Sequence, residues 1–275
     1  MFQTIQRKFR ELKNNIFSQE VKGHFVPTNL SKHFPILLVL GLTSLVLGML
    51  MTHTYYNLYE KIIPYNKSTT LSVYLPPSKI YFYIQIEDFY QTNLKYSKSI
   101  SYKQLKGEKD TNSNHTEPLD SKGGRDYYPA GILPNTFFQD IFSINNLDIQ
   151  TRGISWESMR KRIEPSEYTL NEIRNPPLWE KYKEVPDLRQ NERFVNWIYT
   201  APFYNFRKLW GIIDVQEGGV YDMEIVSTYP YGKKNVVFSE VSWAGTKNYF
   251  LSISLIVIGF AGLIFSGLLF KKMFD

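Results

Sequence analysis

The feature that most constrains this chain is an uncharged run near its C-terminus, Tyr249–Phe270, with the sequence YFLSISLIVIGFAGLIFSGLLF. Its 22 residues would form a helix about 33 Å long, enough to cross a hydrocarbon core of about 30 Å. Lys271 and Lys272 follow directly. A buried helix of a soluble protein seldom runs this far without a polar face. The run therefore predicts a transmembrane helix over residues 249–270.

A second uncharged run, Phe34–Thr52, predicts another membrane span. Its 19 residues correspond to about 28 Å of helix, which is short but sufficient. The alternative is a signal peptide. The run is long for that role, begins after 33 residues and is not followed by a small-residue cleavage site. We therefore expect a retained anchor over residues 34–52.

Two spans place both chain ends on one side of the membrane, and the basic residues indicate which side. Residues 1–33 hold six Lys and Arg against two Glu, and residues 271–275 add two Lys. Residues 53–248 hold 24 basic and 23 acidic residues. By the positive-inside rule, we expect residues 1–33 and 271–275 in the cytosol and residues 53–248 as one lumenal or extracellular domain. The net charge of +6 is then a topology signal and does not indicate nucleic-acid binding.

Two further patterns concern the membrane. Within residues 1–18, apolar side chains recur at spacings of three and four among basic ones. This predicts an amphipathic helix on the cytosolic headgroups or against a partner, with a solvated tail as the alternative. Small residues recur along each span, at Gly41, Ser44 and Gly48 in the first and at Ser252, Gly259, Gly262 and Ser266 in the second. Small residues let helix backbones approach closely in lipid, so these stripes should pack on each other or on another protein's helices.

The central domain is expected to be rich in strands. Apolar and polar residues alternate in Leu71–Leu75 and Lys79–Phe89, which is typical of β-strands. Val220–Thr228 and Asn235–Trp243 predict two more strands, joined as a hairpin by the turn signal at 229–232. Since the domain leaves and re-enters the bilayer, its two ends should lie close together.

Other parts of this domain predict helix and loop. Asn191–Thr200 predicts a short helix with Asn191 as its cap. The polar composition of Lys103–Asp126 predicts a mobile loop. The chain contains no Cys, so the domain has to be held together by packing without disulfides.

The sequence offers no catalytic constellation. The four His do not share metal-ligand spacing, and there is no nucleophile elbow, phosphate loop or dinucleotide fingerprint. Gly123-Gly124 predicts a turn. We therefore expect no catalytic residue, no cofactor, no metal and no enzyme activity of the chain alone. Two sequons on the expected outer side make Asn66 and Asn114 candidate glycosylation sites.

Six groups of short motifs, taken in order, resemble those of one family. They are Asp88-Phe89-Tyr90-Gln91 with Gln104–Gly107; Pro129-Ala130-Gly131 with Asn135, Phe138 and Asp140; Gly153–Trp156; Asn175–Trp179; Asn191-Glu192 with Thr200-Ala201 and Phe206–Trp210; and Val241–Leu251 before the second span. From about Phe17 to Phe270 the chain thereby resembles the cell division control protein 50 family, also called ligand-effect modulators. Members of that family are accessory (beta) subunits of type IV P-type ATPases, the phospholipid flippases.

The resemblance implies a fold and a role. The fold is a membrane protein of α and β structure, with two transmembrane helices flanking one large, mainly antiparallel, sandwich-like β domain with short helices. The implied partners are membrane lipids and a catalytic ATPase subunit, with which the chain forms a heterodimer. The implied role is to support that subunit's folding, its exit from the endoplasmic reticulum and its transport cycle, and hence aminophospholipid asymmetry. The implied compartments are the endoplasmic reticulum, the Golgi or endosome, and the plasma membrane.

The resemblance also indicates candidate contact residues. It places partner contacts in the lumenal motifs, in the second span's small-residue stripe and in the N-terminal helix. The candidate interface residues are Phe89, Tyr90, Gln91, Arg207, Lys208, Trp243, Lys247, Asn248, Gly259, Gly262 and Ser266. The family's lumenal cysteines are absent, and Ala130 stands at one of their positions. Two other functions remain open: a subunit of a two-span ligand-gated channel, and a stand-alone structural or chaperone membrane glycoprotein.

Overall fold

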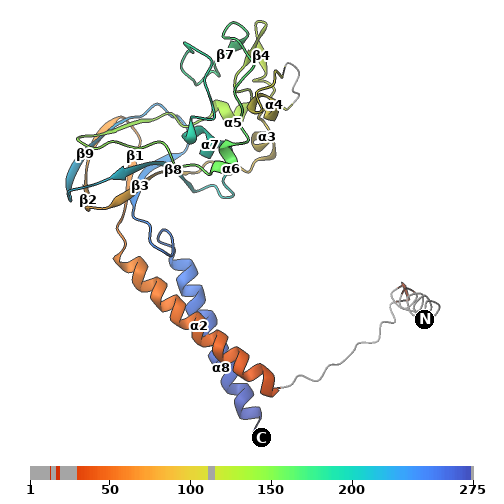
Figure 1. Cartoon of the computed structure of the whole chain (residues 1–275), viewed down its shortest axis with the longest axis vertical. Coiled ribbons are helices and arrows are strands. Elements are labelled where there is room, and N and C mark those ends of the chain that lie inside the picture. Colours follow the sequence, from red (N-terminus) through yellow and green to blue (C-terminus); the bar gives the residue numbers. More distant parts are fainter. Residues whose placement is uncertain (1–12, 14–16, 19–29, 111–114, 274–275) are drawn as a thin grey trace. The chain divides into compact units, whose positions relative to one another are not determined.

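The structure is a computed structural model that describes residues 13, 17, 18, 30–110 and 115–273. The expected N-terminal amphipathic helix falls almost wholly outside these residues, as does Asn114. The chain divides into two compact units (Figure 1): Met1–Thr52 with Tyr249–Asp275, and His53–Asn248. The second unit is called the body below.

Two long helices dominate the first unit. They are α2 (Leu30–Asn57), whose last residues belong to the body, and α8 (Tyr249–Lys272). Both are long and apolar enough to cross a membrane, and both contain the runs singled out in the sequence. Only 17% and 11% of their most apolar stretches are buried, so neither is the core helix of a soluble protein.

The two helices pack on each other through their small residues. A Cβ added to Gly259 would lie 2.7 Å from the backbone N of Leu45. One added to Gly48 would lie 2.9 Å from the carbonyl O of Ser252. Farther along, the Ser266 hydroxyl donates to the carbonyl O of Phe34 at 3.4 Å. The sequence had left open whether the stripes serve this chain or another protein, and here they bring α2 and α8 into backbone contact.

Two antiparallel sheets form the frame of the body. The first has the order β1-β10-β3-β8 and the second the order β2-β9-β6. The strands of the first sheet are β1 (Glu60–Tyr65), β10 (Lys233–Ser239), β3 (Lys79–Glu87) and β8 (Phe206–Asp214). Those of the second are β2 (Thr69–Leu75), β9 (Gly219–Val226) and β6 (Ile141–Ile144).

The two sheets share one aromatic core. Alternate residues of β3 point inward, and Phe82 of the first sheet meets Phe142 of the second with ring centroids 5.1 Å apart. Phe82 also packs on Phe238 of β10 at 5.3 Å. This is the period-two pattern expected of half-buried strands, and it confirms the sandwich-like antiparallel body.

Short helices and a third small sheet complete the body. The helices are α3 (Leu94–Ser97), α4 (Tyr102–Leu105), α5 (Ile132–Asn135), α6 (Glu157–Arg160) and α7 (Glu192–Ile198). The small sheet comprises β4 (Ser121–Lys122), β5 (Arg125–Tyr127) and β7 (Ile173–Arg174). The Asn191 side chain accepts from the backbone N of Phe194 at 3.0 Å, so the predicted cap of α7 is confirmed.

One sequence prediction in the body is wrong, and another holds only in part. β9 and β10 do not form a hairpin, because β9 pairs with β2 and β6 while β10 pairs with β1 and β3. The loop predicted over Lys103–Asp126 is interrupted by the end of α4 and by β4 and β5, and its mobility stays a prediction. Leu105 and Gly107 are buried, and β4 and β5 form a hairpin around Gly123-Gly124, as the turn prediction required.

The two ends of the body lie together, as expected for a domain that leaves and re-enters a membrane. The Tyr55 hydroxyl donates to the carbonyl O of Ala244 at 2.9 Å. The backbone N of Tyr59 donates to Glu240 Oε2, also at 2.9 Å.

Candidate functional site

The sequence motifs meet one another in the body although they lie far apart in the chain. Gln91 is fully buried, and its Oε1 accepts from the backbone N of Ala201 at 2.8 Å. Gln104 is also buried and accepts from the backbone N of Ala130 at 2.8 Å, while it donates to the carbonyl O of Tyr127 at 3.0 Å. Each of these side-chain amides therefore holds its own segment against a segment that is distant in the sequence.

Two motif glycines are required by backbone geometry. Gly107 has φ +86° and Gly131 has φ +114°, a region that side chains rarely adopt. A Cβ at either position would also overlap a carbonyl oxygen, that of Pro165 or that of Ser99. Glycine is therefore needed at these two motif positions because another backbone segment lies in direct contact with each of them.

The Glu192 carboxylate is surrounded by hydrogen-bond donors. Its two oxygens accept from the backbone N–H groups of Gly153, Ile154 and Ser155 at 2.8–3.0 Å and from Arg160 at 2.9 Å. Burial alone would raise the pKa of Glu192, but the hydrogen bonds outweigh it and lower that pKa below its ordinary value. The first residue of α7 thus fixes the loop before α6.

A buried ion pair joins Asp140 to Lys234 in the core. Asp140 accepts from Lys234 Nζ and from the Tyr65 hydroxyl, each at 2.8 Å. The backbone N–H groups of Thr228 and Tyr229 donate to its other oxygen, both at 2.6 Å. Because every oxygen lone pair faces a donor, the cost of burying this charge is largely offset.

Arg207 and Lys208 both bond to other residues of the body, but Lys208 is buried and Arg207 is exposed. Lys208 is 9% exposed, and its Nζ donates to the carbonyl oxygens of Asn196, at 3.0 Å, and Tyr199, which follows α7. Burial lowers the pKa of Lys208 to about 8. Arg207 Nε donates to Gln85 Oε1 at 2.7 Å, and its NH1 pairs with Glu60 at 2.8 Å.

Phe89 and Tyr90 face different surroundings. Phe89 is half-buried in an aromatic cluster, with ring centroids 5.6 Å from Tyr96 and 6.3 Å from Trp197. Tyr90 is 63% exposed and stacks on Tyr204, with centroids 5.5 Å apart. Tyr204 lies between the motif segments Thr200-Ala201 and Phe206–Trp210 and is itself half exposed, so this pair presents an aromatic surface.

The last motif forms a tight turn with an exposed tryptophan. The backbone N of Ser242 donates to the carbonyl O of Gly245 at 3.1 Å, and the reverse bond is 3.0 Å. Trp243, between them, is 69% exposed. Lys247 is half-exposed and Asn248 is exposed.

The candidate interface residues differ in exposure. Tyr90, Arg207, Trp243 and Asn248 are exposed, and Phe89 and Lys247 are partly buried. The side chains of Gln91 and Lys208 are turned into the body, and the small residues of α8 contact α2. That any of them contacts a partner stays a prediction.

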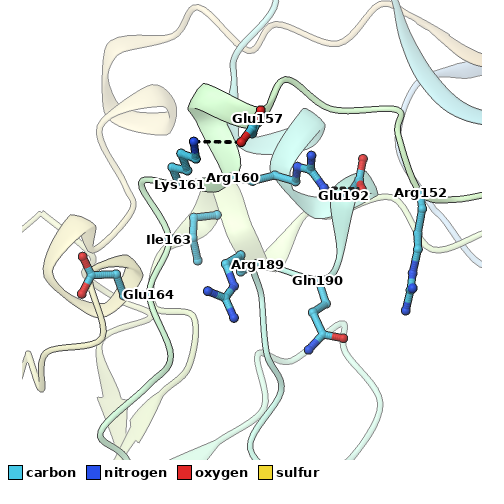
Figure 2. A pocket seen from close by; sticks show the side chains of 9 residues that line it. All are labelled: Arg152, Glu157, Arg160, Lys161, Ile163, Glu164, Arg189, Gln190 and Glu192. Atoms are coloured by element: carbon cyan, nitrogen blue, oxygen red, sulfur yellow. Dashed lines mark hydrogen bonds and ion pairs between the residues drawn. The ribbon is translucent and has the colours of Figure 1, made fainter.

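A cavity of about 580 Å³ opens beside α6 (Figure 2). Its charged side chains largely pair among themselves: Arg160 with Glu192 at 2.9 Å and Lys161 with Glu157 at 2.8 Å. In the described ranges of the chain, no three His, Asp or Glu side chains gather where they could hold a metal ion.

Comparison with known families decides what this architecture belongs to. Residues 66–274, more than half of the chain, match the family described as LEM3 (ligand-effect modulator 3) family / CDC50 family. The chain belongs to the CDC50 family.

Two of three relatives of this CDC50 family member carry names that concern phospholipid transport. The phospholipid-transporting ATPase accessory subunit CDC50 of Chaetomium thermophilum is 32% identical over 219 residues, which cover 67% of this chain and 54% of that protein. The accessory subunit LEM3 of Saccharomyces cerevisiae is 30% identical over 66% of this chain and 51% of its own length. ALA-interacting subunit 3 of Arabidopsis thaliana is 31% identical over 66% of this chain and 55% of its own length. The chain therefore spans about half the length of these relatives.

In this CDC50 family member, sequence reasoning found the motif residues but missed their partners. Lys234 went unnoticed, although alternation along β10 places it on the inward side with Val236 and Phe238. Arg160 had no such signal, because its role depends on a carboxylate 32 positions away. Family membership and the two apolar helices together identify a membrane protein.

Proposed function

We propose that this chain is the non-catalytic accessory subunit of a phospholipid-transporting type IV P-type ATPase. The observation that carries the proposal is its likeness to the relatives named as accessory subunits of phospholipid-transporting ATPases. ATP chemistry and the lipid path would belong to a separate catalytic chain, with which this one forms a heterodimer. Its role would be to support that chain's folding, exit from the endoplasmic reticulum and transport cycle, in the endoplasmic reticulum, Golgi or endosome, or plasma membrane.

The proposal includes a topology. Both termini lie in the cytosol, and the body lies in the lumen or outside, where it contacts the outer loops of the catalytic chain. The exposed aromatic side chains of Tyr90 and its stacking partner Tyr204, and that of Trp243, would supply part of this contact surface. Aromatic side chains are enriched at stable protein interfaces.

Affinity purification of the tagged full-length chain in mild detergent tests this function. We expect a P-type ATPase catalytic chain to co-purify in equimolar amount, identified by mass spectrometry, and to migrate with the bait in a native gel. A tagged two-span membrane protein of another family, handled identically, should not retain that ATPase.

Three outcomes would contradict the proposal. A self-trimer would favour the channel subunit. Purification without any ATPase would favour a stand-alone glycoprotein. Turnover of a substrate by the isolated chain would show that it is itself catalytic.

A further inference from the structure

A second cavity, of about 640 Å³, lies at the small sheet formed by β4, β5 and β7. Four cationic side chains line it: Lys122 of β4, Arg125 of β5, Arg174 of β7 and Lys181. No carboxylate is among its described lining residues. This distinguishes it from the cavity in Figure 2, where Glu157 and Glu192 neutralise two cations.

The four cations have no counterion in the part of the chain that the structure describes. None of them takes part in an ion pair there. Two carboxylates close to them in sequence bond to other residues. Asp126, next to Arg125, accepts from the Tyr168 hydroxyl at 2.8 Å, and Glu172 accepts from Lys109 Nζ at 2.5 Å.

Two of the cations are placed directly against each other. Lys122 and Arg125 are opposite partners in the register of the β4–β5 hairpin. Gly123 and Gly124, with φ +64° and +73°, close the turn between them and fix that register. Like charges directly opposite on paired strands are destabilising. All four side chains are exposed, so water screens part of this repulsion, and a bound anion would remove more of it.

We propose that this cavity binds a compact, multiply charged phosphate group. Two guanidinium groups offer forked donors that match phosphate oxygens, and two ammonium groups add point charges. A single carboxylate would leave most of the positive charge uncompensated, whereas a phosphomonoester carries about two negative charges. The volume lies in the range of small-ligand sites. The phosphate can come from a phosphorylated lipid headgroup or from a free polyphosphate, which share this chemistry.

The test uses the full-length chain in nanodiscs of pure phosphatidylcholine, with inorganic pyrophosphate as the probe in calorimetry. We expect saturable binding that weakens as salt is added, because exposed charges are screened. The double variant Lys122→Gln/Arg174→Gln should bind at least about tenfold more weakly, since it loses two charge-assisted partners. The matched control Arg152→Gln/Arg189→Gln removes two cations from the cavity of Figure 2 and should bind like the unmodified chain.

Stability gives a second readout that does not need the ligand. Lys122→Gln removes one member of the opposed pair, so we expect its melting temperature without pyrophosphate to equal or exceed that of the unmodified chain. A clear fall would show that the cation has a structural partner and would overturn the proposal. Absence of saturable pyrophosphate binding, or equal binding by the two double variants, would overturn it too.

A further arm identifies the source of the phosphate. Nanodiscs containing phosphatidic acid should suppress pyrophosphate binding if the chain takes the headgroup from its own membrane, and leave it unchanged if the ligand is free in solution. Poly-glutamate peptide is the competing probe. If it binds the same cations more tightly than pyrophosphate does, the ligand of the cavity is an acidic protein segment and the phosphate proposal is overturned. These measurements need no ATPase partner, so their outcome is independent of the proposed function.

Discussion

Two buried carboxylates hold much of the loop structure of the body in place. Asp140 and Glu192 each accept backbone hydrogen bonds from a distant segment and each pair with a cation. A buried charge is tolerated only with such complete partnership. Motif carboxylates of this kind are positioning residues for the fold.

Replacing Glu192 by Gln tests this role. The amide keeps the shape but loses the charge that three backbone N–H groups and Arg160 share. We expect Glu192→Gln to lower the free energy of unfolding by about 2–4 kcal/mol, measured by thermal unfolding of the full-length chain in detergent. Glu157→Gln, which breaks an exposed ion pair with Lys161, is the control and should melt with the unmodified chain. Equal melting of both variants would contradict the role.

The same substitution carries a pH signature. Because hydrogen bonds lower the folded-state pKa of Glu192, its contribution is fully present above the ordinary Glu pKa of about 4.3. It is lost as pH falls through the lowered folded value, where the carboxylate takes up a proton. The melting curves of the unmodified chain and Glu192→Gln should therefore converge on acidification and stay apart at neutral pH.

At the residue scale, the sequence identified which positions matter but not the direction in which they act. Gln91 and Lys208 belong to motifs that resemble a family with a protein partner, yet their side chains bond to Ala201, Asn196 and Tyr199 in this chain. A motif indicates that a residue type is needed at a position. Only the folded structure shows whether the side chain bonds within its own chain or is free to contact a partner.

At the element scale, local patterns predicted elements well and pairing poorly. The uncharged runs became α2 and α8, and the alternation in Lys79–Phe89 became β3. β1 and β8 went unpredicted as strands, because Pro64 lies within one and a bulge opposite Phe82/Tyr83 interrupts the other. The expected β9–β10 hairpin does not form because the two strands belong to different sheets, β9 between β2 and β6 and β10 between β1 and β3.

The contact between α2 and α8 yields an element-scale prediction. An Ala Cβ at Gly259 would meet the backbone N of Leu45 at 2.7 Å, so the helices have to separate. We expect Gly259→Ala to cost about 1–3 kcal/mol, seen as a lower melting temperature in detergent. Gly267 lies on the same helix and has no atom within 4 Å of an added Cβ, so Gly267→Ala should be neutral. Equal effects of the two substitutions would show that α2 does not press on this face.

At the scale of the whole molecule, a body without cysteine relies on packing and buried polar networks alone. Its frame joins strands from both ends of the body, as in the pairing of β1 with β10. The hydrogen bond from the Tyr55 hydroxyl to the carbonyl O of Ala244 joins the first and last segments of the body. A body built in this way has both connections to the membrane at neighbouring positions, which suits a chain that crosses twice.

The absence of cysteine also allows a direct test of topology, because any introduced cysteine is the only thiol in the chain. Lys67 is exposed in the turn between β1 and β2, and Met273 is exposed after α8. With the body outside and the tails in the cytosol, a membrane-impermeant maleimide should label Lys67→Cys on intact cells for chains that reach the plasma membrane. It should label Met273→Cys only after permeabilisation. Both variants should react equally in detergent, which controls for intrinsic accessibility. Labelling of Met273→Cys on intact cells, with Lys67→Cys protected, would reverse the orientation that the basic tails predict.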